Sequence, residues 1–575
     1  MNVIQVIQNY IETIASLSKG MKIMLLDAST TPMMSMATTK SFLLSREIYL
    51  IEKVLRCIYG RILTNDSRLE NSKRENVRHL TCICVIKPCF ESVQHLSEEL
   101  RSPKYGRYFV YFTNILNKNY LEILAASDDH EVVQSLQEIF ADYLAVHSDL
   151  AALYLPISTH NLWNKRWDTW DSIALQKSRD GLLSILLSLK KKPIIRYERN
   201  SNMAKVLGNE VKKMMEEEEQ LFNFYRMDAA PILLILDRCN DPVTPLLTQW
   251  TYEAMVHELV GIEHGRVDIS NMIYEKKLKE IILSPEQDAF FKENMYLNFG
   301  DLGTRIKEYV DHYHSKTKSN IEIQNVSDMK RFIEEYPEFR QLSGNVSKHV
   351  ILMSELSTRV NKESLLEVSE LEQSLACNDS HSTDLKNLQK LIQSPISNNN
   401  KIRLVLLYAL RYEKNKNNTL SSLILSLAQA GVTPKELSII NTLLEYAGSS
   451  KRLDNLYELE SIFSRARSGF KGLNDVENVY TQHRPRLQNI LTSLIKGRLR
   501  EQTHPCIEES TTLKEKPQDI IVYMVGGTTY TEARIVHEIN LYIPGVRIIL
   551  ASDHIHNSKS FLQQLKRFNT TKINK

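Results

Sequence analysis

Several features that mark particular protein classes are scarce or missing in this chain of 575 residues. Glycine and proline number 18 and 16, about half their usual combined share, which favours helices over turn-rich β-architecture. A large excess of one sign of charge is also missing, because 72 lysines and arginines nearly balance 69 aspartates and glutamates. The net charge of +3 provides no global field for phosphate backbones or acidic lipids. We therefore expect no nucleic-acid partner.

Long apolar runs are missing as well. No window reaches the ~18 apolar residues of a membrane span, and the N-terminus lacks the basic region, apolar stretch and cleavage site of a signal peptide. The 7 cysteines are odd in number and irregularly spaced, so they predict no disulfide framework. We expect a reducing, cytosolic setting and only peripheral contact with membranes.

What is present is an alternation of helices and strands. Short apolar runs at residues 23–26 and 231–236 are each followed by an aspartate, as expected for buried parallel strands that end at a sheet edge. Alternation over the first ~125 residues predicts a doubly wound α/β domain. A further helix is predicted over residues 131–143, and another from Thr244, with Pro245 in its first turn, to about residue 261.

The α/β pattern returns at the C-terminal end. Residues 520–525 and 546–550 read as strands, with a helix from Tyr530 between them. The ~60 residues after Pro517 are too few for a doubly wound domain, so this unit should complete the sheet that begins near residue 130. The helical region between the two parts is then an insertion.

Strand signals nearly vanish between residues 262 and 475, and residues 377–400, rich in serine and asparagine, read as an exposed linker. The predicted fold class is α/β, with two doubly wound parallel-sheet domains and a large, mostly helical insertion. The predicted domains are residues 1–128, residues 129–245 with 476–575, and residues 246–475, which include a helical arm at about 300–360.

Gly526 and Gly527 stand where a strand turns into a helix, a place where backbone amides can cradle a phosphate. The surrounding residues match neither the P-loop nor the dinucleotide-binding pattern, and Thr529 with Glu532 forms a capping box that satisfies the helix start. We interpret the glycines as a structural turn.

Other candidates for chemistry are weak. Asp27 and Asp237 end strands where α/β enzymes place catalytic carboxylates, but they should belong to different sheets, and Arg238 should neutralise Asp237. The remaining candidates are cysteine and histidine pairs without a third ligand at a zinc-like spacing: Cys82 with Cys84, and His554 with His556. We predict no metal site and no catalytic residue.

The helical insertion carries apolar positions at helical spacing, and such surfaces bind other helices. Pro337 interrupts the pattern, because it lacks the amide donor and clashes with the preceding turn. It can act as a hinge that changes the length of the arm, or as an ordinary helix start. The sequence leaves both readings open.

Three segments resemble the SM family of cytosolic syntaxin-binding proteins, which govern SNARE-mediated membrane fusion. They are LDRCNDPVTPLL at 236–247, continued by WTYEAM at 250–255, then GGTTYTEAR at 526–534 and HNSKSFL at 556–562. Five further segments resemble one branch of this family in particular: 1–3, 343–350, 366–373, 408–413 and 478–483. The resemblance covers essentially the whole chain.

The resemblance implies an arch-shaped, three-domain protein without enzymatic activity or cofactor. It implies a monomer that grips a syntaxin-type (Qa) SNARE between the first domain and the arm, and that binds a short N-terminal syntaxin peptide on the outer face of the first domain. It further implies a cytoplasmic protein, held peripherally through SNAREs at Golgi, trans-Golgi and endosomal membranes, that promotes vesicle docking and fusion.

The resemblance also places the two binding sites. The peptide pocket maps onto two consecutive predicted helices: Leu121, Leu124 and Ala125 on one, and Val133 and Leu136 on the next. The SNARE-helix arm maps onto Phe332, Tyr336, Pro337, Phe339, Leu342 and Val346. Without the resemblance, the pocket residues would be interpreted as ordinary core.

Two other functions remain open from the residues alone. A nucleotide- or sugar-dependent transferase would use the strand ends at Asp27 and Gly526, and a stoichiometric small ligand would reveal it. A passive tether would bind syntaxin and leave fusion kinetics unchanged.

Overall fold

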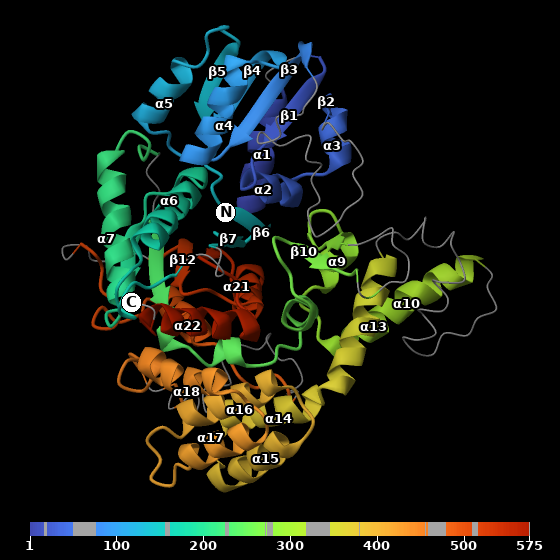
Figure 1. Ribbon diagram of the computed structural model, residues 1–575, viewed down its shortest axis with the longest axis vertical. Helices are drawn as coiled ribbons and strands as arrows, with labels where there is room; N and C mark the ends of the chain where they lie inside the picture. The colour runs from blue at the N-terminus through green and yellow to red at the C-terminus, as the bar shows by residue number, and fades with distance from the viewer. Residues whose placement is uncertain are drawn as a thin grey trace.

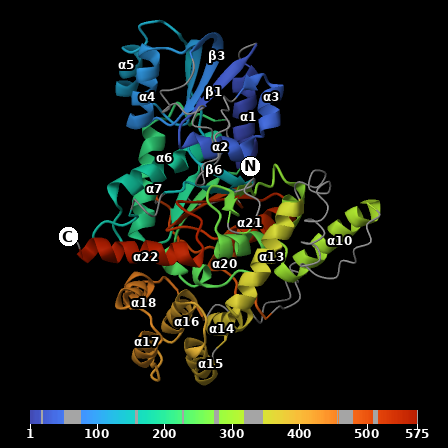
Figure 2. The same ribbon diagram turned by 45° about the vertical axis from the view of Figure 1, so that its right-hand side comes forward.

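The computed structural model describes residues 1–16, 20–49, 76–155, 161–224, 229–270, 272, 280–317, 346–378, 380–454, 456–457, 479–508 and 516–573. Three blocks follow one another along the longest axis: a first sheet, a second sheet and a bundle of helices (Figure 1). Two helices, α10 (Phe299–Thr317) and α13 (Val346–Lys362), project to one side (Figure 2). Among the residues covered by these ranges, no helix is long and apolar enough to cross a bilayer.

The first sheet has five parallel strands in the order β2-β1-β3-β4-β5. Helix α1 (Val3–Ser16) buries its apolar stripe on one face, while α4 (Phe90–Arg101) and α5 (Lys118–Ala125) cover the other. The remaining elements are β1 (Lys22–Leu26), α2 (Thr30–Ala37), α3 (Lys40–Ser45), β2 (Ile48–Tyr49), β3 (Val77–Ile86), β4 (Tyr105–Phe112) and β5 (Val133–Glu138).

The helix predicted over residues 131–143 is wrong. Residues 133–138 form β5, which pairs in parallel with β4, so that Val110 lies opposite Leu136. The apolar spacing of this short segment fits a helix and a strand equally well, and pairing with β4 decides between them. As an edge strand, β5 tolerates the exposed Gln137 and Glu138. The first sheet therefore extends beyond the predicted boundary at residue 128.

The second sheet is built from distant parts of the chain, in the order β6-β7-β13-β12-β9-β8. All neighbours are parallel except the edge pair β6 and β7. The prediction that the C-terminal unit completes this sheet is confirmed, since β12 (Asp519–Val525) pairs with β9 (Ile232–Asp237). The other strands are β6 (Leu144–His147), β7 (Leu150–Ala152), β8 (Ile194–Tyr197) and β13 (Arg547–Ser552).

Both faces of the second sheet are buried. This explains why the sequence of β12 is almost uniformly apolar. Ile521 and Tyr523 face one hydrophobic cluster, whereas Ile520 and Val522 face the other. Because successive side chains point to opposite faces, a strand covered on both sides needs no polar positions. The covering helices are α6 (Ser172–Ser188), α7 (Asn202–Glu217), α20 (Arg486–Ile495), α21 (Tyr530–Tyr542) and α22 (Ser558–Ile573).

The segment from residue 244 to 261 is not one helix. It contains η3 (Thr244–Leu246), a non-helical stretch, α8 (Tyr252–Met255) and the π-helical η4 (Val256–Val260). The Thr248 amide donates to Glu372 and the Tyr252 amide to the Leu297 carbonyl, so tertiary partners replace the helical ones.

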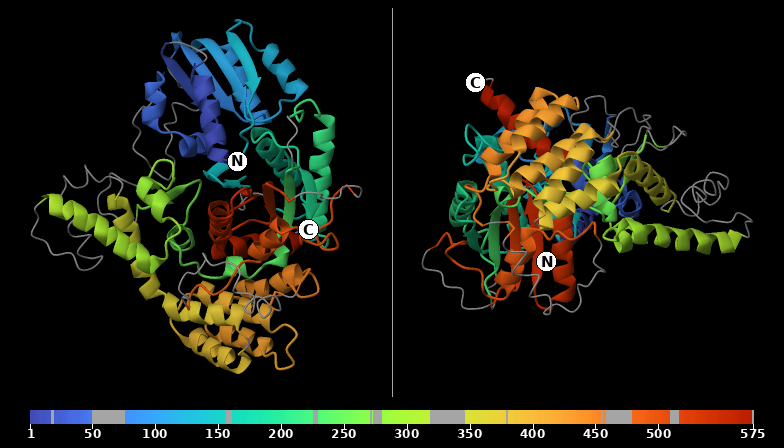
Figure 3. Two further views of the ribbon diagram at one scale, coloured as in Figure 1. Left: turned by 180° about the vertical axis from the view of Figure 1, so that it is seen from behind. Right: turned by 90° about the horizontal axis from the view of Figure 1, so that it is seen from below.

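The helical insertion also departs from prediction at residues 377–400, where α15 (His381–Gln393) replaces the expected linker. Its buried residues Leu388, Leu391 and Ile392 share one face, and polar residues cover the rest. The other elements here are β10 (Arg266–Asp268), β11 (Glu280–Ile282), α9 (Ala289–Asn294), α14 (Leu365–Cys377), α16 (Asn398–Arg411), α17 (Leu420–Gln429) and α18 (Pro434–Ala447). Seen from behind, the first sheet, the second sheet and the helical block follow one another, with α10 and α13 to one side, as in the arch-shaped three-domain fold that the resemblance implies (Figure 3).

Candidate functional site

Both oxygens of the carboxylate at the end of β1 accept hydrogen bonds from within the fold. One oxygen of Asp27 accepts from the amides of Ser29 (2.9 Å) and Thr30 (2.8 Å). The other accepts from the Lys87 amide (2.6 Å) and the Ser92 hydroxyl (2.8 Å). Asp27 thus ties the end of β1 to the end of β3 and the start of α4. As predicted, it lies in a different sheet from Asp237.

This edge of the first sheet rests directly against α6. Lys87 Nζ pairs with Asp142 at 2.6 Å, and the Asp142 amide donates to the Ser184 hydroxyl at 2.8 Å. The Asn114 side chain donates to the carbonyl of Asp180 at 3.0 Å. In open parallel sheets this carboxyl-terminal edge is where ligands usually bind. Here it joins two parts of the same protein.

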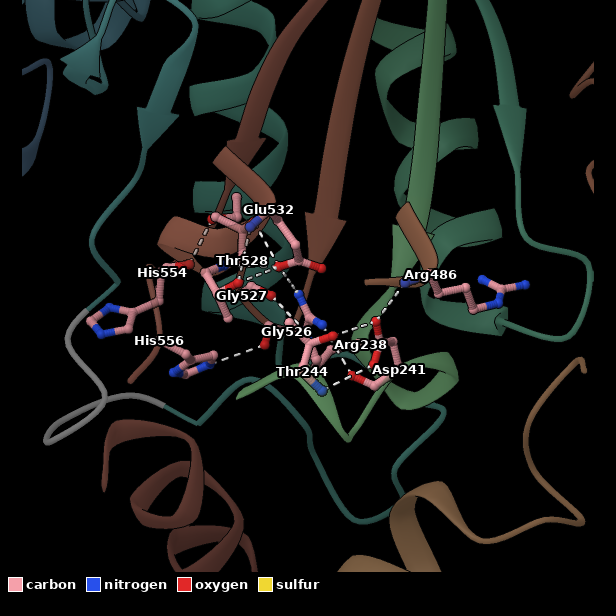
Figure 4. A network of polar contacts seen from close by, with 12 residues as sticks. Arg238, Asp241, Thr244, Arg486, Gly526, Gly527, Thr528, Glu532, His554 and His556 are labelled. Carbon is pink, nitrogen blue, oxygen red and sulfur yellow. Dashed lines mark hydrogen bonds and ion pairs between the residues drawn. The ribbon is translucent and has the colours of Figure 1, made fainter. Parts of the chain in front are cut away.

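The carboxyl-terminal edge of the second sheet holds a buried polar network (Figure 4). Gly526 and Gly527, at φ values of +85° and +91°, donate their amides to one oxygen of Asp553 at 2.9 and 3.1 Å. A Cβ on Gly527 would stand 2.2 Å from Cδ2 of His556. The amides that could cradle a phosphate are therefore occupied by the chain's own carboxyl group, and the interpretation as a structural turn is confirmed.

Arg238 lies at the centre of this network, with its side chain fully buried. It pairs with Glu532 at 2.5 Å and donates to the carbonyls of Gly527 and Asp241, each at 3.0 Å. The prediction that Arg238 neutralises Asp237 is wrong, because Asp237 accepts from Ser201 and from the amide of Cys239 instead. Burial raises the pKa of Asp237.

The same network connects the second sheet to α20. Asp241 accepts from the Thr244 hydroxyl at 2.7 Å and from the Arg486 amide at 3.1 Å. Burial alone would raise the pKa of Asp241, but the Arg238 charge holds it below its usual value. On α21, Thr529 and Glu532 form the predicted capping box.

The histidines and cysteines considered above as metal ligands take part in the hydrogen bonding and packing of the fold. His556 Nε2 lies 3.0 Å from the Gly526 carbonyl, and its Nδ1 lies 3.0 Å from the Ser560 hydroxyl, at the start of α22. Cys82 and Cys84 are buried in β3. Across the described part of the chain, no three histidine, cysteine or acidic residues are arranged to hold a metal ion.

A buried histidine near this edge predicts a loss of stability in acid. His257 Nδ1 accepts from the Ile262 amide at 3.2 Å, and Nε2 lies 3.2 Å from the Ile555 carbonyl, so the neutral ring satisfies both. Burial lowers the pKa of His257 from 6.5 to about 4. The unfolded chain therefore takes up this proton first as the pH falls, and His257 should cost about 2 kcal/mol of stability between pH 7 and pH 5.

The measurement is the urea midpoint of unfolding at pH 7 and pH 5. A His257→Gln variant can keep both hydrogen bonds and cannot gain a charge, so its midpoint should fall less than that of the native chain. Equal falls in both proteins would contradict this assignment.

The predicted peptide pocket lies on the first block. Leu124 is buried beneath α5, and the half-buried Val133 and Leu136 of β5 pack against the same hydrophobic cluster. Leu121 and Ala125 are exposed on α5, with Leu121 at 46%. The structure thus brings together Leu124, Val133 and Leu136, although the last two come from a strand rather than the predicted helix.

The predicted arm residues from Phe332 to Leu342 lie outside the described residues, and of Val346 only the backbone is described, as the first residue of α13. The base of α13 is held by buried polar contacts. His349 bonds through Nδ1 to the Tyr252 hydroxyl (2.7 Å) and through Nε2 to Asp288 (2.8 Å). Lys348 pairs with the same carboxylate at 2.6 Å. These contacts fix the first turn of α13 against the starts of α8 and α9.

The sequence pattern of the Sec1 family matches residues 22–564. Vacuolar protein sorting-associated protein 45 of Schizosaccharomyces pombe is 48% identical over 575 residues, covering 99% of this chain and 100% of that protein. The Homo sapiens protein of the same name is 42% identical over 569 residues, covering 98% and 96%. This is the branch that the five sequence segments resemble.

Solved structures agree. The SM protein Vps45 in complex with the Qa SNARE Tlg2 (1-310) is 49% identical, covers 100% of this chain and 99% of that chain, and has a TM-score of 0.88. Sly1p in complex with an N-terminal peptide of Sed5p is 16% identical and covers 99% of this chain and 99% of that chain, with a TM-score of 0.73, which shows the shared fold. With its family pattern matched from residue 22 to residue 564, this chain belongs to the Sec1, or SM, family.

Proposed function

We propose that this chain is an SM-type regulator of SNARE assembly, which binds a Golgi or endosomal syntaxin and promotes vesicle docking and fusion. The observation that carries this proposal is the likeness, over the whole chain, to Vps45 in complex with the Qa SNARE Tlg2. That likeness amounts to 49% identity and a TM-score of 0.88, over 100% of this chain.

The proposal assigns two contacts to the syntaxin. Its N-terminal peptide binds at α5, which exposes Leu121 and Ala125, and at β5, where Val133 and Leu136 are half-buried. Its SNARE helix lies between the first domain and the arm to which α10 and α13 belong. Support for the first contact comes from the exposed apolar side chains, and for the second from the anchoring of the first turn of α13 by His349 and Asp288.

The proposed mechanism needs no covalent step. The protein holds one helix in a fixed place, a second SNARE helix docks beside it in register, and much of the entropy cost of assembling the bundle is removed in advance. A transferase is the less favoured function, because Asp27 and the amides of Gly526 and Gly527 bind groups of the chain itself. We propose a cytoplasmic location, with peripheral association at Golgi, trans-Golgi and endosomal membranes.

The test uses the purified chain and residues 1–310 of Tlg2. Calorimetry should detect a complex, and adding the chain to liposomes that carry the matching SNAREs should speed their fusion. Binding without any change in fusion rate would leave only a passive tether. Failure to bind this or other Qa SNAREs would remove the proposal.

The peptide contact predicts a selective variant. Replacing Leu121 with Arg should weaken binding of the syntaxin N-terminal peptide at least about tenfold, because a guanidinium replaces an apolar contact in the pocket. Leu121 is 46% exposed in the free chain, so folding should be preserved. The matched control is Leu366→Arg on α14, where the native side chain is 44% exposed. Calorimetry should give an unchanged affinity for the control, and an unchanged affinity for Leu121→Arg would show that the pocket is misplaced.

A further inference from the structure

An apolar hollow lies on the Ile123 side of α5. It is a groove of about 200 Å³ between α4 and α5, with Phe90, Val93 and Ile123 among its walls and Glu98 and Arg101 among its charged lining residues. Phe90 is 63% exposed and Ile123 is 41% exposed. The two helices lie side by side in Figures 1 and 2.

Helix α5 separates this groove from the proposed peptide pocket. Successive residues of a helix are turned by about 100°, so Leu121 and Ala125 share one flank and Ile123 points about 200° away from Leu121. Leu124 is buried beneath the helix. A short helix of 8 residues thus presents apolar side chains on two exposed flanks while it buries only one residue. Folding alone does not require the second flank to be apolar.

The lining of the groove indicates which kind of partner it suits. Glu98 and Arg101 place both signs of charge in it, and Gln94 donates to Glu98 at 3.3 Å. A surface for lipid headgroups or nucleic-acid phosphates would instead carry a cluster of cations. Apolar walls with mixed polar side chains suit a peptide, whose backbone offers both donors and acceptors.

The distance between the two sites favours one continuous peptide. A helix is 10–12 Å wide with its side chains, and an extended chain advances ~3.3 Å per residue, so about four residues cross α5. Once a first apolar residue is bound on the Leu121 flank, the following residues are held near the groove at an effective concentration in the millimolar range. A separate ligand would have no such advantage.

We propose that the groove between α4 and α5 is a second subsite for the syntaxin N-terminal peptide, which crosses α5 and places one apolar residue on each flank. This inference rests on the proposed function and makes it more specific. The peptide it describes has two apolar anchors separated by about four to six residues.

The test compares two groups of variants by calorimetry. The probe is a synthetic peptide of the first ~20 residues of Tlg2, long enough at ~3.3 Å per residue to span both flanks. A double variant with Phe90→Ala and Ile123→Ser should bind it about tenfold more weakly, because an apolar anchor loses its walls. The control Leu541→Ser removes a side chain that is 65% exposed on α21 and should leave the affinity unchanged. Unchanged thermal midpoints should confirm that all the variants are folded.

Double-mutant cycles then separate the two sites. Each apolar residue of the peptide is replaced in turn by alanine and measured against Leu121→Ala and against Ile123→Ser. The inference predicts that Leu121 and Ile123 couple to two different peptide residues. If Leu121→Arg abolishes binding while the groove variant binds normally, the second subsite is overturned and the pocket stands. If Leu121→Arg has no effect, the pocket of the proposed function fails, and the two-anchor arrangement fails with it.

Discussion

Replacing Glu532 with alanine should destabilise the protein by about 3–5 kcal/mol, a large part of the ~5–15 kcal/mol that keeps a typical domain folded. Glu532 is fully buried, pairs with the equally buried Arg238, and also accepts from the amide of Thr529 at 2.9 Å. Without it, Arg238 keeps a buried positive charge that only the Asp241 carboxylate offsets, and only in part. The measurement is the urea midpoint of unfolding by tryptophan fluorescence, together with the yield of soluble protein.

The control for this variant lies on the same helix. Glu538→Ala removes a pair with Arg534 at 2.7 Å whose side chains are 22% and 23% exposed. Such a pair contributes about 0.5 kcal/mol, because both side chains keep some contact with water. Similar midpoints for the two variants would show that burial of the Arg238 pair has no energetic consequence.

The second large effect should come from Gly527→Ala, which should cost about 2–5 kcal/mol. The backbone there has φ = +91°, a conformation that residues with a side chain rarely adopt, and the new Cβ would stand 2.2 Å from the ring of His556. Backbone strain accounts for ~1–3 kcal/mol, and displacing the buried histidine accounts for a similar amount. Thermal and urea unfolding measure the sum.

Gly545 separates the two contributions. It has φ = +81°, and no atom lies within 4 Å of the Cβ position, so Gly545→Ala carries the backbone strain without the clash. Its cost should be about 1–3 kcal/mol. The difference between the variants measures the clash with His556, and equal costs would contradict the geometry of this turn.

The parts of the fold that could be predicted are those with strong local signals. The buried strand β9 and the capping box of Thr529 and Glu532 are encoded within a few neighbouring residues. Strand β5 and helix α15 depend on distant contacts: β5 takes its conformation from pairing with β4, and α15 from burying Leu388 and Ile392 against its neighbours. Local patterns are ambiguous at such places.

The candidate site also has features that the sequence predicts and features that only the structure shows. Family motifs place Leu121, Leu124 and Ala125 on one helix, and the structure adds that only Leu124 is buried. The role of Asp553 as acceptor for both glycine amides has no local signal, because 26 residues separate it from Gly527. The groove beside Ile123 is also invisible in the sequence, since exposure depends on how α4 and α5 pack together.

The two closed sheet edges have a consequence for how the protein can work. The first edge is fastened to α6 through Lys87 and Asp142, and the second meets the helical block, where Leu453 donates to Asn240 at 2.8 Å and Arg486 pairs with Asp454. Separating either of these contacts would leave several buried polar groups without hydrogen-bond partners, at a free-energy cost of ~1–3 kcal/mol each. That cost exceeds the free energy that a single docking contact contributes. The scaffold is therefore preorganised, and most of the ordering that two helices need is completed when the protein folds.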